Sequence, residues 1–253
     1  MKAKSLCAVA LATLFLGGSV VSAAPMDPMD TNGTVKVENG KIDTEDGLTD
    51  PEDPDKKLPV DELPDVIENP NTDMGPLEIS HAPGLSFGTV KTATKEVTAF
   101  AAANSYTDAD GAQKRGALLQ FGDLRTDANG YTVSAQLKTQ FTQGTNVLNG
   151  STISFANPWS NTATGATGTT PDFVSNFELS LGETKPVATA KNLDKAGKGM
   201  WAVEYGSSDQ VGDMTDTTDS SVQLAIPANT ASSMAGGDYV AVIEWSISNV
   251  PGV

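Results

Sequence analysis

Short segments in which apolar and polar residues alternate recur from residue 77 to the end of the chain. In Tyr131–Lys138, the alternation places Tyr131, Val133, Ala135 and Leu137 on one face. A period of two is typical of a β-strand with one buried face. The other such segments are residues 151–155, 177–181, 200–205, 222–226 and 239–248. Several short strands, each with one apolar face, predict an all-β protein folded as an antiparallel β-sandwich.

Helix signals are scarce, and at most Glu96–Asn104 is expected to wind a turn or two. Near the N-terminus, Thr34–Val37 alternates and predicts a short strand. The strand pattern resumes at Leu77–Ile79 and at Leu85–Gly88. Because a lone strand is not stable, we expect Thr34–Val37 to pair with the later body.

The region between these strands is acidic and rich in proline. Residues 43–76 contain many Asp, Glu and Pro residues and no aromatic residue. Such a composition buries too little apolar area to offset the entropy of ordering the chain, and proline stiffens it. We therefore expect an extended acidic loop or linker, inserted within one β-domain that spans residues 33–253.

The N-terminus has the features of a secretory signal. The basic residues Lys2 and Lys4 precede a short apolar run. The run is followed by a site with small residues that ends at Ala23, as signal peptidase requires. This pattern predicts a signal peptide over residues 1–23, followed by a mature N-terminal segment over residues 24–32. The single cysteine, Cys7, lies inside that signal and has no lipobox before it, so the mature chain is expected to use no disulfide.

Two partner classes are excluded by charge and hydropathy. The formal net charge is −16, and nucleic-acid binding needs clustered Lys and Arg. No apolar run after the signal approaches the ~20 residues of a membrane span. No LPxTG-like sorting signal is present either. We therefore expect a secreted protein without a membrane span, which holds the cell surface non-covalently.

The residue inventory does not favour an enzyme. The single histidine, His81, is not accompanied by a Gly-x-Ser-x-Gly elbow, and no cysteine nucleophile remains in the mature chain. Glycoside hydrolysis would need a fixed pair of carboxylates, and the sequence singles out none. Asp108–Gly111 and Asp209–Asp219 are carboxylate-rich, but neither follows the EF-hand pattern. We expect no catalytic residue, metal or cofactor.

Two short motifs carry a family resemblance. Near the C-terminus, Tyr239 is followed after five residues by Trp245-Ser246-Ile247. Upstream, Gly130 precedes Tyr131-Thr132-Val133. The chain resembles the WxL-domain cell-surface proteins of Gram-positive bacteria, with Ile247 where that family has Leu, and with Tyr131 and Val133 where it has Trp and Leu. Partial matches at residues 33–37, 85–89 and 148–155 extend the resemblance over nearly the whole mature chain.

The resemblance implies a non-catalytic surface protein attached non-covalently to peptidoglycan, working with other surface proteins of the same system. The alternative is an interaction subunit or adhesin that docks onto another surface protein or host matrix. The apolar strand over residues 239–248 motivates this alternative, since a sheet edge can pair with a partner strand.

Aromatic residues are the expected contacts to sugars, because their faces stack on apolar C–H groups. The resemblance points to Tyr131 and Trp245, but both lie on the apolar faces of their strands. Core packing and wall contact therefore remain alternatives for each. Trp159 is expected in a turn-like loop, as either a ligand contact or a side chain folded back over the sandwich. The candidate site residues are Tyr131, Val133, Trp159, Tyr239, Trp245 and Ile247.

Overall fold

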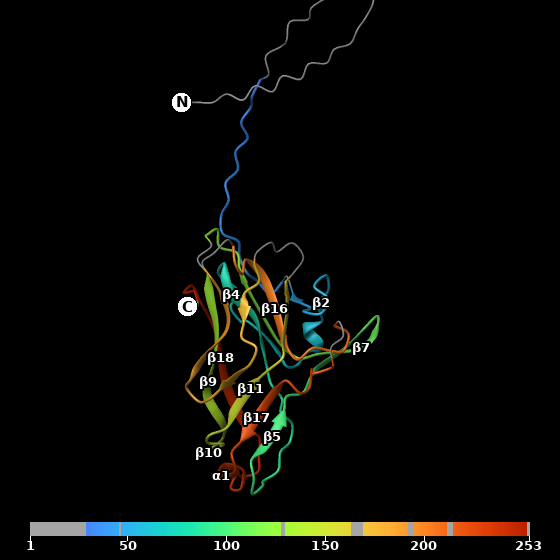
Figure 1. The fold of residues 1–253 in the computed structure, drawn as a ribbon, viewed down its shortest axis with the longest axis vertical. Helices are drawn as coiled ribbons and strands as arrows, with labels where there is room; N and C mark the ends of the chain where they lie inside the picture. Colours follow the sequence, from blue (N-terminus) through green and yellow to red (C-terminus); the bar gives the residue numbers. More distant parts are fainter. Residues whose placement is uncertain are drawn as a thin grey trace, which may run out of the picture. The chain divides into compact units, whose positions relative to one another are not determined.

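The computed structural model describes residues 29–45, 47–127, 130–162, 169–191, 195–211 and 215–251. The chain divides into two compact units, residues 1–36 and residues 37–253. In the described part of the first unit, residues 29–36, the backbone forms neither helix nor strand. All the elements below belong to the second unit (Figure 1). The predicted signal peptide, with Cys7, lies outside the described residues.

The strand predicted over Thr34–Val37 is wrong. No strand is formed over these residues, and the side chains of Val35 and Val37 are 89% and 74% exposed. Two alternating valines satisfy a strand pattern, but a strand needs a partner that supplies hydrogen bonds and an apolar surface. Among the described strands, none pairs with Val35 or Val37.

Three larger antiparallel sheets form the second unit. The first sheet contains β9 (Tyr131–Gln143), which pairs with β15 (Thr184–Ala190), β18 (Val240–Ser248) and β10 (Asn146–Val147), while β13 (Asp172–Phe173) pairs with β15. The second sheet runs β14 (Phe177–Leu179), β11 (Thr152–Phe155), β17 (Val222–Ile226) and β5 (Val97–Phe100). The third runs β12 (Pro158–Thr162), β16 (Gly199–Tyr205), β8 (Ala117–Asp123), β4 (Leu77–Pro83) and β3 (Val66–Glu68). The predicted all-β, antiparallel architecture is confirmed.

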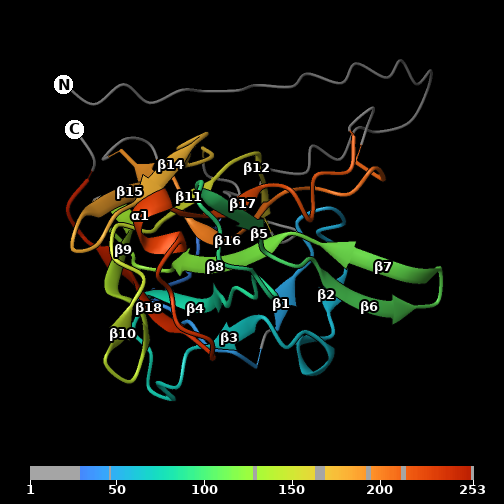
Figure 2. The same ribbon diagram turned by 90° about the horizontal axis from the view of Figure 1, so that it is seen from below.

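The smaller elements lie outside these sheets. Two hairpin-sized sheets pair β1 (Leu48–Thr49) with β2 (Lys57–Leu58) and β6 (Asn104–Asp108) with β7 (Gly111–Arg115). Figure 2 shows β6 and β7 projecting from the side of the three sheets. The helical elements of the described chain are one 3₁₀ turn, η1 (Val60–Glu62), and one short helix, α1 (Ala228–Ala231).

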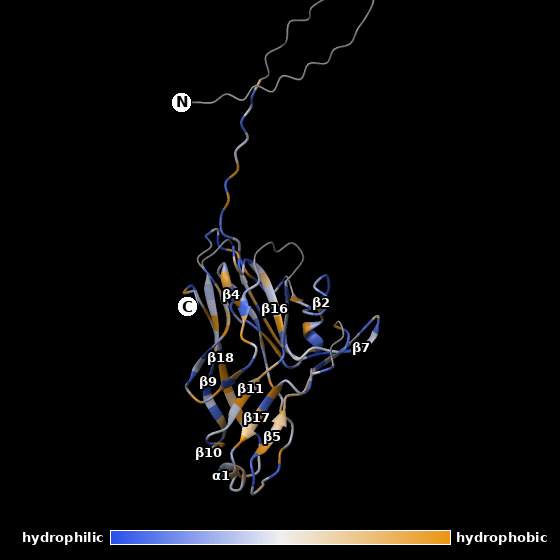
Figure 3. Ribbon diagram, viewed as in Figure 1, coloured by the Kyte–Doolittle hydropathy of each residue, from blue (hydrophilic) through white to orange (hydrophobic). Residues whose placement is uncertain are grey.

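One apolar core lies between the three sheets. The predicted face of β9 is inside it, with Tyr131, Val133, Ala135 and Leu137 at most 1% exposed. Aromatic rings from the other two sheets meet there: Phe155 stacks on Phe177 at 4.7 Å, and Tyr205 meets Phe155 edge-on at 5.1 Å. Such pairs add stabilisation beyond the apolar area they bury. Figure 3 shows hydrophobic residues along β5 and β17, which also border this core.

The residues expected to wind a helical turn, Glu96–Asn104, instead contain β5, which pairs with β17. The pairing aligns Val97 with Ile226 and Ala99 with Leu224. Four residues are too few to show a helical or a strand period in the sequence. The apolar edge of β17 therefore decides the conformation by offering β5 both hydrogen bonds and a packing surface.

The acidic stretch over residues 43–76 also differs from the expected extended loop. Residues 47–68, called the covering segment below, contain β1, β2, η1 and β3. Its apolar residues form a second core with Tyr106 and Leu118; these residues are Leu48, Leu58, Leu63 and Val66. Composition alone underestimated this burial, because four well-placed apolar side chains suffice once the third sheet offers them a surface.

The central strand β8 and most of its neighbour β16 are consequently buried on both faces of the third sheet. On β8, Leu119 and Phe121 face the main core, while Leu118 belongs to the second core under the covering segment. On β16, Val203 and Tyr205 face the main core, and the intervening Glu204 is 0% exposed. Since successive side chains of a strand point to opposite faces, Glu204 points towards the covering segment.

Candidate functional site

The two motifs quoted above meet on neighbouring strands. β18 runs antiparallel to β9, and the register places Ile247 opposite Val133 and Trp245 opposite Ala135. Figure 1 shows the two strands side by side, although they come from distant parts of the sequence. Among the described strands, β18 pairs only with β9, so it is an edge strand.

Tyr131 and Val133 belong to the core. Both side chains are 0% exposed. The Tyr131 hydroxyl donates a hydrogen bond to the Gly197 carbonyl at 3.0 Å, and its ring meets Phe121 edge-on at 5.8 Å. Burial raises the pKa of the Tyr131 hydroxyl far above its usual range. In this arrangement, neither Tyr131 nor Val133 can touch a ligand.

Trp245 and Ile247 occupy a different position, half-buried on the inner face of β18. The Trp245 ring meets Phe155 edge-on, with centroids 5.8 Å apart at 88°. Its indole Nε1 is buried and makes no hydrogen bond with the described residues. Trp245 thus packs against the core with one part of its ring and lines an open groove with another.

That groove, called the β18 groove, has a volume of about 330 Å³. One wall comes from β3, from the end of β4 and from the residues that follow β4. The other wall comes from β18 and from Tyr239, the residue before it. The wall residues are Ile67, Ala82, Pro83, Gly84, Leu85 and Phe87 on the first side, and Tyr239, Val240, Ala241, Ile243 and Trp245 on the second, over a floor of Phe141 and Ile153. No charged side chain lines the groove.

A larger cavity of about 570 Å³ adjoins the β18 groove and shares Leu85, Phe87, Phe141 and Tyr239 with it. It lies between two loops, residues 85–92 and residues 234–239, and is called the loop cavity. The strand predicted over Leu85–Gly88 is not formed, and Gly88 adopts a φ of 63° that favours glycine. Tyr239 is half-buried there, and its hydroxyl donates to the Ala235 carbonyl at 3.1 Å.

A family model of the WxL domain, described as surface cell wall-binding, matches residues 25–251. The chain belongs to the WxL family. No curated protein and no solved structure matches it. The match makes this chain a cell-wall-binding protein of the cell surface. No helix in the described ranges is long and apolar enough to cross a membrane.

Trp159 lies on β12 of this WxL domain, not in the turn expected from the sequence. Its indole Nε1 donates to the Pro51 carbonyl at 2.9 Å, which ties β12 to the covering segment. The half-buried ring also lines a separate pocket of about 280 Å³ with Asn157, Pro158, Ser207, Thr215 and Thr217. This pocket shares no residue with the β18 groove or the loop cavity.

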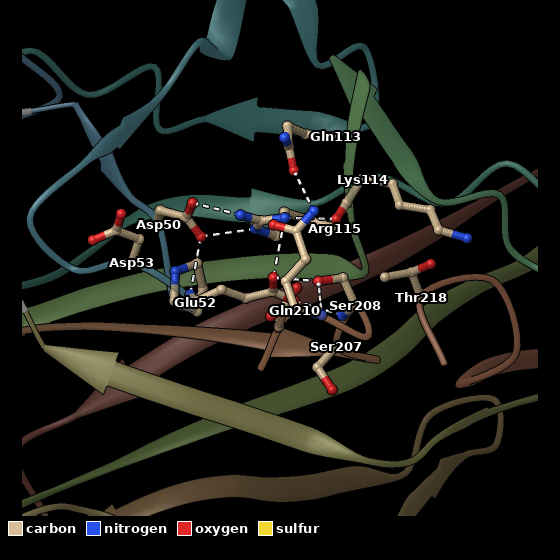
Figure 4. Close-up of polar contacts among 12 residues, drawn as sticks. Asp50, Glu52, Asp53, Gln113, Lys114, Arg115, Ser207, Ser208, Gln210 and Thr218 are labelled. Carbon is tan, nitrogen blue, oxygen red and sulfur yellow. Dashed lines mark hydrogen bonds and ion pairs between the residues drawn. The ribbon is translucent and has the colours of Figure 1, made fainter. Parts of the chain in front are cut away.

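A buried charge cluster, which the sequence reasoning missed, holds the covering segment of the WxL domain in place. Arg115 donates to both carboxylate oxygens of Asp50, at 2.8 and 2.7 Å, and lies 3.1 Å from Glu52 (Figure 4). Glu52 also accepts hydrogen bonds at 2.5 Å from the backbone and hydroxyl of Ser208. A paired, hydrogen-bonded arrangement of this kind is what buried charges require.

Glu204 adds a third carboxyl group to this cluster. One of its oxygens accepts a hydrogen bond from the Gly116 backbone at 3.1 Å, and the other has no partner among the described residues. Burial, followed by the charge of Glu52, raises the pKa of Glu204 well above its usual range. The carboxyl therefore keeps its proton to a higher pH than a carboxyl in water. No sequence signal marks the cluster, because its members come from separate elements.

The single histidine occupies a second polar network under the covering segment. His81 Nδ1 lies 3.0 Å from the Ser80 hydroxyl, and Nε2 lies 3.9 Å from Glu68. Burial, with Lys57 nearby, lowers the pKa of His81 to about 4. A Ser-His-acid triad needs a hydrogen bond between the histidine and the acid, but His81 Nε2 makes none with the described residues. Ser80 and His81 are also both 0% exposed.

The carboxylate-rich turn considered for calcium is formed by local hydrogen bonding. The Asp108 carboxylate accepts the backbone N–H of Asp110 at 2.8 Å, and Asp110 pairs with Lys56 at 3.3 Å. No group of three or more His, Cys, Asp or Glu side chains able to hold a metal ion is found within the described residues.

Proposed function

We propose that this WxL protein attaches non-covalently to peptidoglycan and performs no catalysis on it. The observation that carries the proposal is the aromatic-lined surface formed by the β18 groove and the adjoining loop cavity. One wall of the groove is the strand that bears the Trp245-Ser246-Ile247 motif. An aromatic-lined surface of this kind suits ligands that combine apolar faces with hydroxyl groups.

The six residues predicted from the sequence take different roles, and two of them line this surface. Trp245 and Tyr239 line the groove and are proposed as contacts. Tyr131 and Val133 support β18 from within the core, with Val133 opposite Ile247. Trp159 lines its own pocket and fixes the covering segment.

Co-sedimentation of the mature protein with purified peptidoglycan tests the attachment. We expect the wild type to sediment, and Trp245→Ala to sediment less, because the substitution removes an aromatic wall of the groove. Since Trp245→Ala also removes core packing, Ile67→Ser provides a second variant on the opposite wall, where the side chain is 55% exposed. Val242→Ala is the matched control, because Val242 is 46% exposed on the outer face of β18.

Absence of sedimentation in the folded wild type would contradict attachment to peptidoglycan. Protein that resists extraction by hot detergent would contradict non-covalent binding. Soluble muropeptides released during the incubation would contradict the absence of catalysis.

The free edge of β18 favours a second candidate function, docking onto another surface protein. Val240 and Val242 are 68% and 46% exposed on this strand, and edge strands pair readily with other chains. Purified protein that binds peptidoglycan unaided would favour the first proposal. Protein that reaches the wall only when a second surface protein is present would favour docking.

A further inference from the structure

The loop cavity is lined by buried apolar side chains at its floor and by two loops that carry both apolar and polar groups. Its floor consists of buried apolar side chains, namely Phe141, Leu148, Leu224 and Ile226, and the rings of Phe87 and Tyr239 stand at its side. The two loops add the hydroxyl groups of Ser86, Thr89 and Thr92, the backbone of residues 235–237, and the partly buried side chains of Leu85, Val90 and Met234. An apolar floor with hydroxyl groups on the loops suits a ligand that has an apolar part to place on the floor and hydroxyl groups of its own.

Charge narrows the class of ligand further. Asp238 is the charged residue in the cavity lining, which contains no Lys, Arg or His. The adjoining β18 groove has no charged lining residue. A free carboxylate would find no cation there and would face the field of an acidic protein of net charge −16. The surface therefore suits an uncharged ligand.

The cavity is held open by its own contacts. The Ser86 carbonyl accepts a hydrogen bond from the Ala102 backbone at 2.8 Å, and the Ala231 carbonyl accepts one from Ala93 at 3.1 Å, which together anchor the first loop. Phe87 rests edge-on against Phe141 at 5.9 Å. The hydrogen bond from Tyr239 to Ala235 braces the second loop. A site formed before binding avoids the entropic cost of ordering these loops.

Peptidoglycan offers two chemistries to such a surface. Its stem peptides carry free carboxylate and amino groups, whereas its glycan strand presents sugar C–H faces, hydroxyl groups and the methyl group of each acetamido substituent. We propose that the loop cavity binds the N-acetylated sugars of the glycan strand, with an acetamido methyl group directed to the apolar floor. This inference rests on the proposed function and specifies which part of peptidoglycan is bound.

Calorimetric titration of the mature protein tests the choice of ligand. The probes are a tetrasaccharide of N-acetylglucosamine, a tetrasaccharide of glucose, and a synthetic stem peptide. We expect saturable binding of the acetylated sugar and about tenfold weaker binding of the glucose oligomer, because the latter lacks the methyl group that fills the apolar floor. No binding of the stem peptide is expected.

Two substitutions locate the binding at the cavity. Gly236 lines the cavity, and a side-chain carbon added there meets no atom within 4 Å, so Gly236→Leu is expected to obstruct the cavity without disturbing the fold. Tyr239→Ala removes an aromatic ring from the side of the cavity. Both variants are expected to lose most of the sugar binding, while Val242→Ala, outside the cavity, retains it.

The outcomes separate this inference from the proposed function. Wild-type protein that sediments with peptidoglycan but ignores the acetylated sugar would overturn the inference and leave wall attachment standing. Preference for the stem peptide, or undiminished sugar binding by both cavity variants, would also overturn it. Protein that neither sediments nor binds sugar would overturn both.

Discussion

Two tyrosine hydroxyl groups in this protein make similar hydrogen bonds in different surroundings. Tyr131 donates to the Gly197 carbonyl at 3.0 Å from a fully buried position, and Tyr239 donates to the Ala235 carbonyl at 3.1 Å beside an open cavity. Tyr131→Phe leaves a buried carbonyl group without its donor, so we expect a loss of about 1–3 kcal/mol in the free energy of unfolding. Tyr239→Phe is expected to cost far less, because water replaces the donor.

Urea unfolding followed by tryptophan fluorescence measures both variants. Equal destabilisation by the two substitutions would contradict the assignment of Tyr131 to the core and Tyr239 to the exposed cavity.

Glu204 couples folding to pH through its raised pKa. The unfolded chain has a carboxyl with the ordinary pKa near 4.5, whereas burial and the charge of Glu52 raise the pKa in the folded protein. Above pH 4.5 the folded state therefore binds more protons at this residue than the unfolded state. This contribution to stability is fully present below pH 4.5 and is lost as pH rises towards the folded-state pKa.

Glu204→Gln should remove this loss, because the amide has no charge to develop. Near pH 4 we expect the variant and the wild type to differ little. Above pH 6.5, His81 is neutral in both the folded and the unfolded state and no longer contributes to the pH dependence of stability. There the variant should become more stable relative to the wild type, by up to about 1.4 kcal/mol per pH unit.

The groups facing Glu204 are Glu52 from the covering segment, Arg115 from β7 and the Gly116 backbone. Unfolding curves at several pH values test the expected difference, with Glu178→Gln as a control on the exposed face of β14. Parallel pH profiles for Glu204→Gln and the wild type would contradict the expected ionisation.

At the scale of elements, the covering segment shows how little apolar surface is needed for an acidic stretch to fold. Leu63 is 2% exposed and belongs to the second core with Leu48, Leu58 and Leu118. Arg115 links the same segment to β7 through Asp50 and Glu52. Apolar packing and charge pairing thus both hold the covering segment, while other acidic residues of it, such as Asp55, Asp61 and Glu62, are exposed.

Leu63→Ala should destabilise the protein by about 2–5 kcal/mol, since it opens a cavity in the second core. Leu181→Ala, at a side chain that is 56% exposed, should change stability by no more than about 0.5 kcal/mol. Hydrogen exchange of residues 47–68, measured together with urea unfolding, checks both expectations. A Leu63→Ala variant as stable as the wild type would show that the segment is an unpacked spacer after all.

β18 illustrates the opposite arrangement, an apolar strand that is incompletely covered. Its alternate residues from Ala241 to Ile247 are half-buried, whereas the corresponding face of β9 is fully buried from Tyr131 to Leu137. The difference follows from position, because β9 has neighbours on both sides and β18 lies at the edge. The sequence pattern of the two strands is the same and does not distinguish these positions.

At the scale of the whole molecule, the strands with clear alternation were predictable. Tyr131–Lys138 and residues 222–226 form strands because a period of two and β-favouring residues agree there. The family motifs were also visible as residue patterns. The weaker segments were not: Val97–Phe100 took its conformation from β17, and Thr34–Val37 found no partner. Segments this short have too weak an intrinsic preference for one secondary structure, so the residues that pack against them determine their conformation.

The sequence by itself determined the strand periodicity, the acidic charge and the two motifs, because each of these depends on neighbouring residues alone. The tertiary structure decided which motif residues are buried, how the covering segment packs, and where the β18 groove and the loop cavity open. Those features require segments from distant parts of the chain to meet, as Val133 meets Ile247 and Arg115 meets Asp50. These features are stabilised by burial and pairing between residues far apart in the sequence, and a local sequence pattern does not specify such contacts.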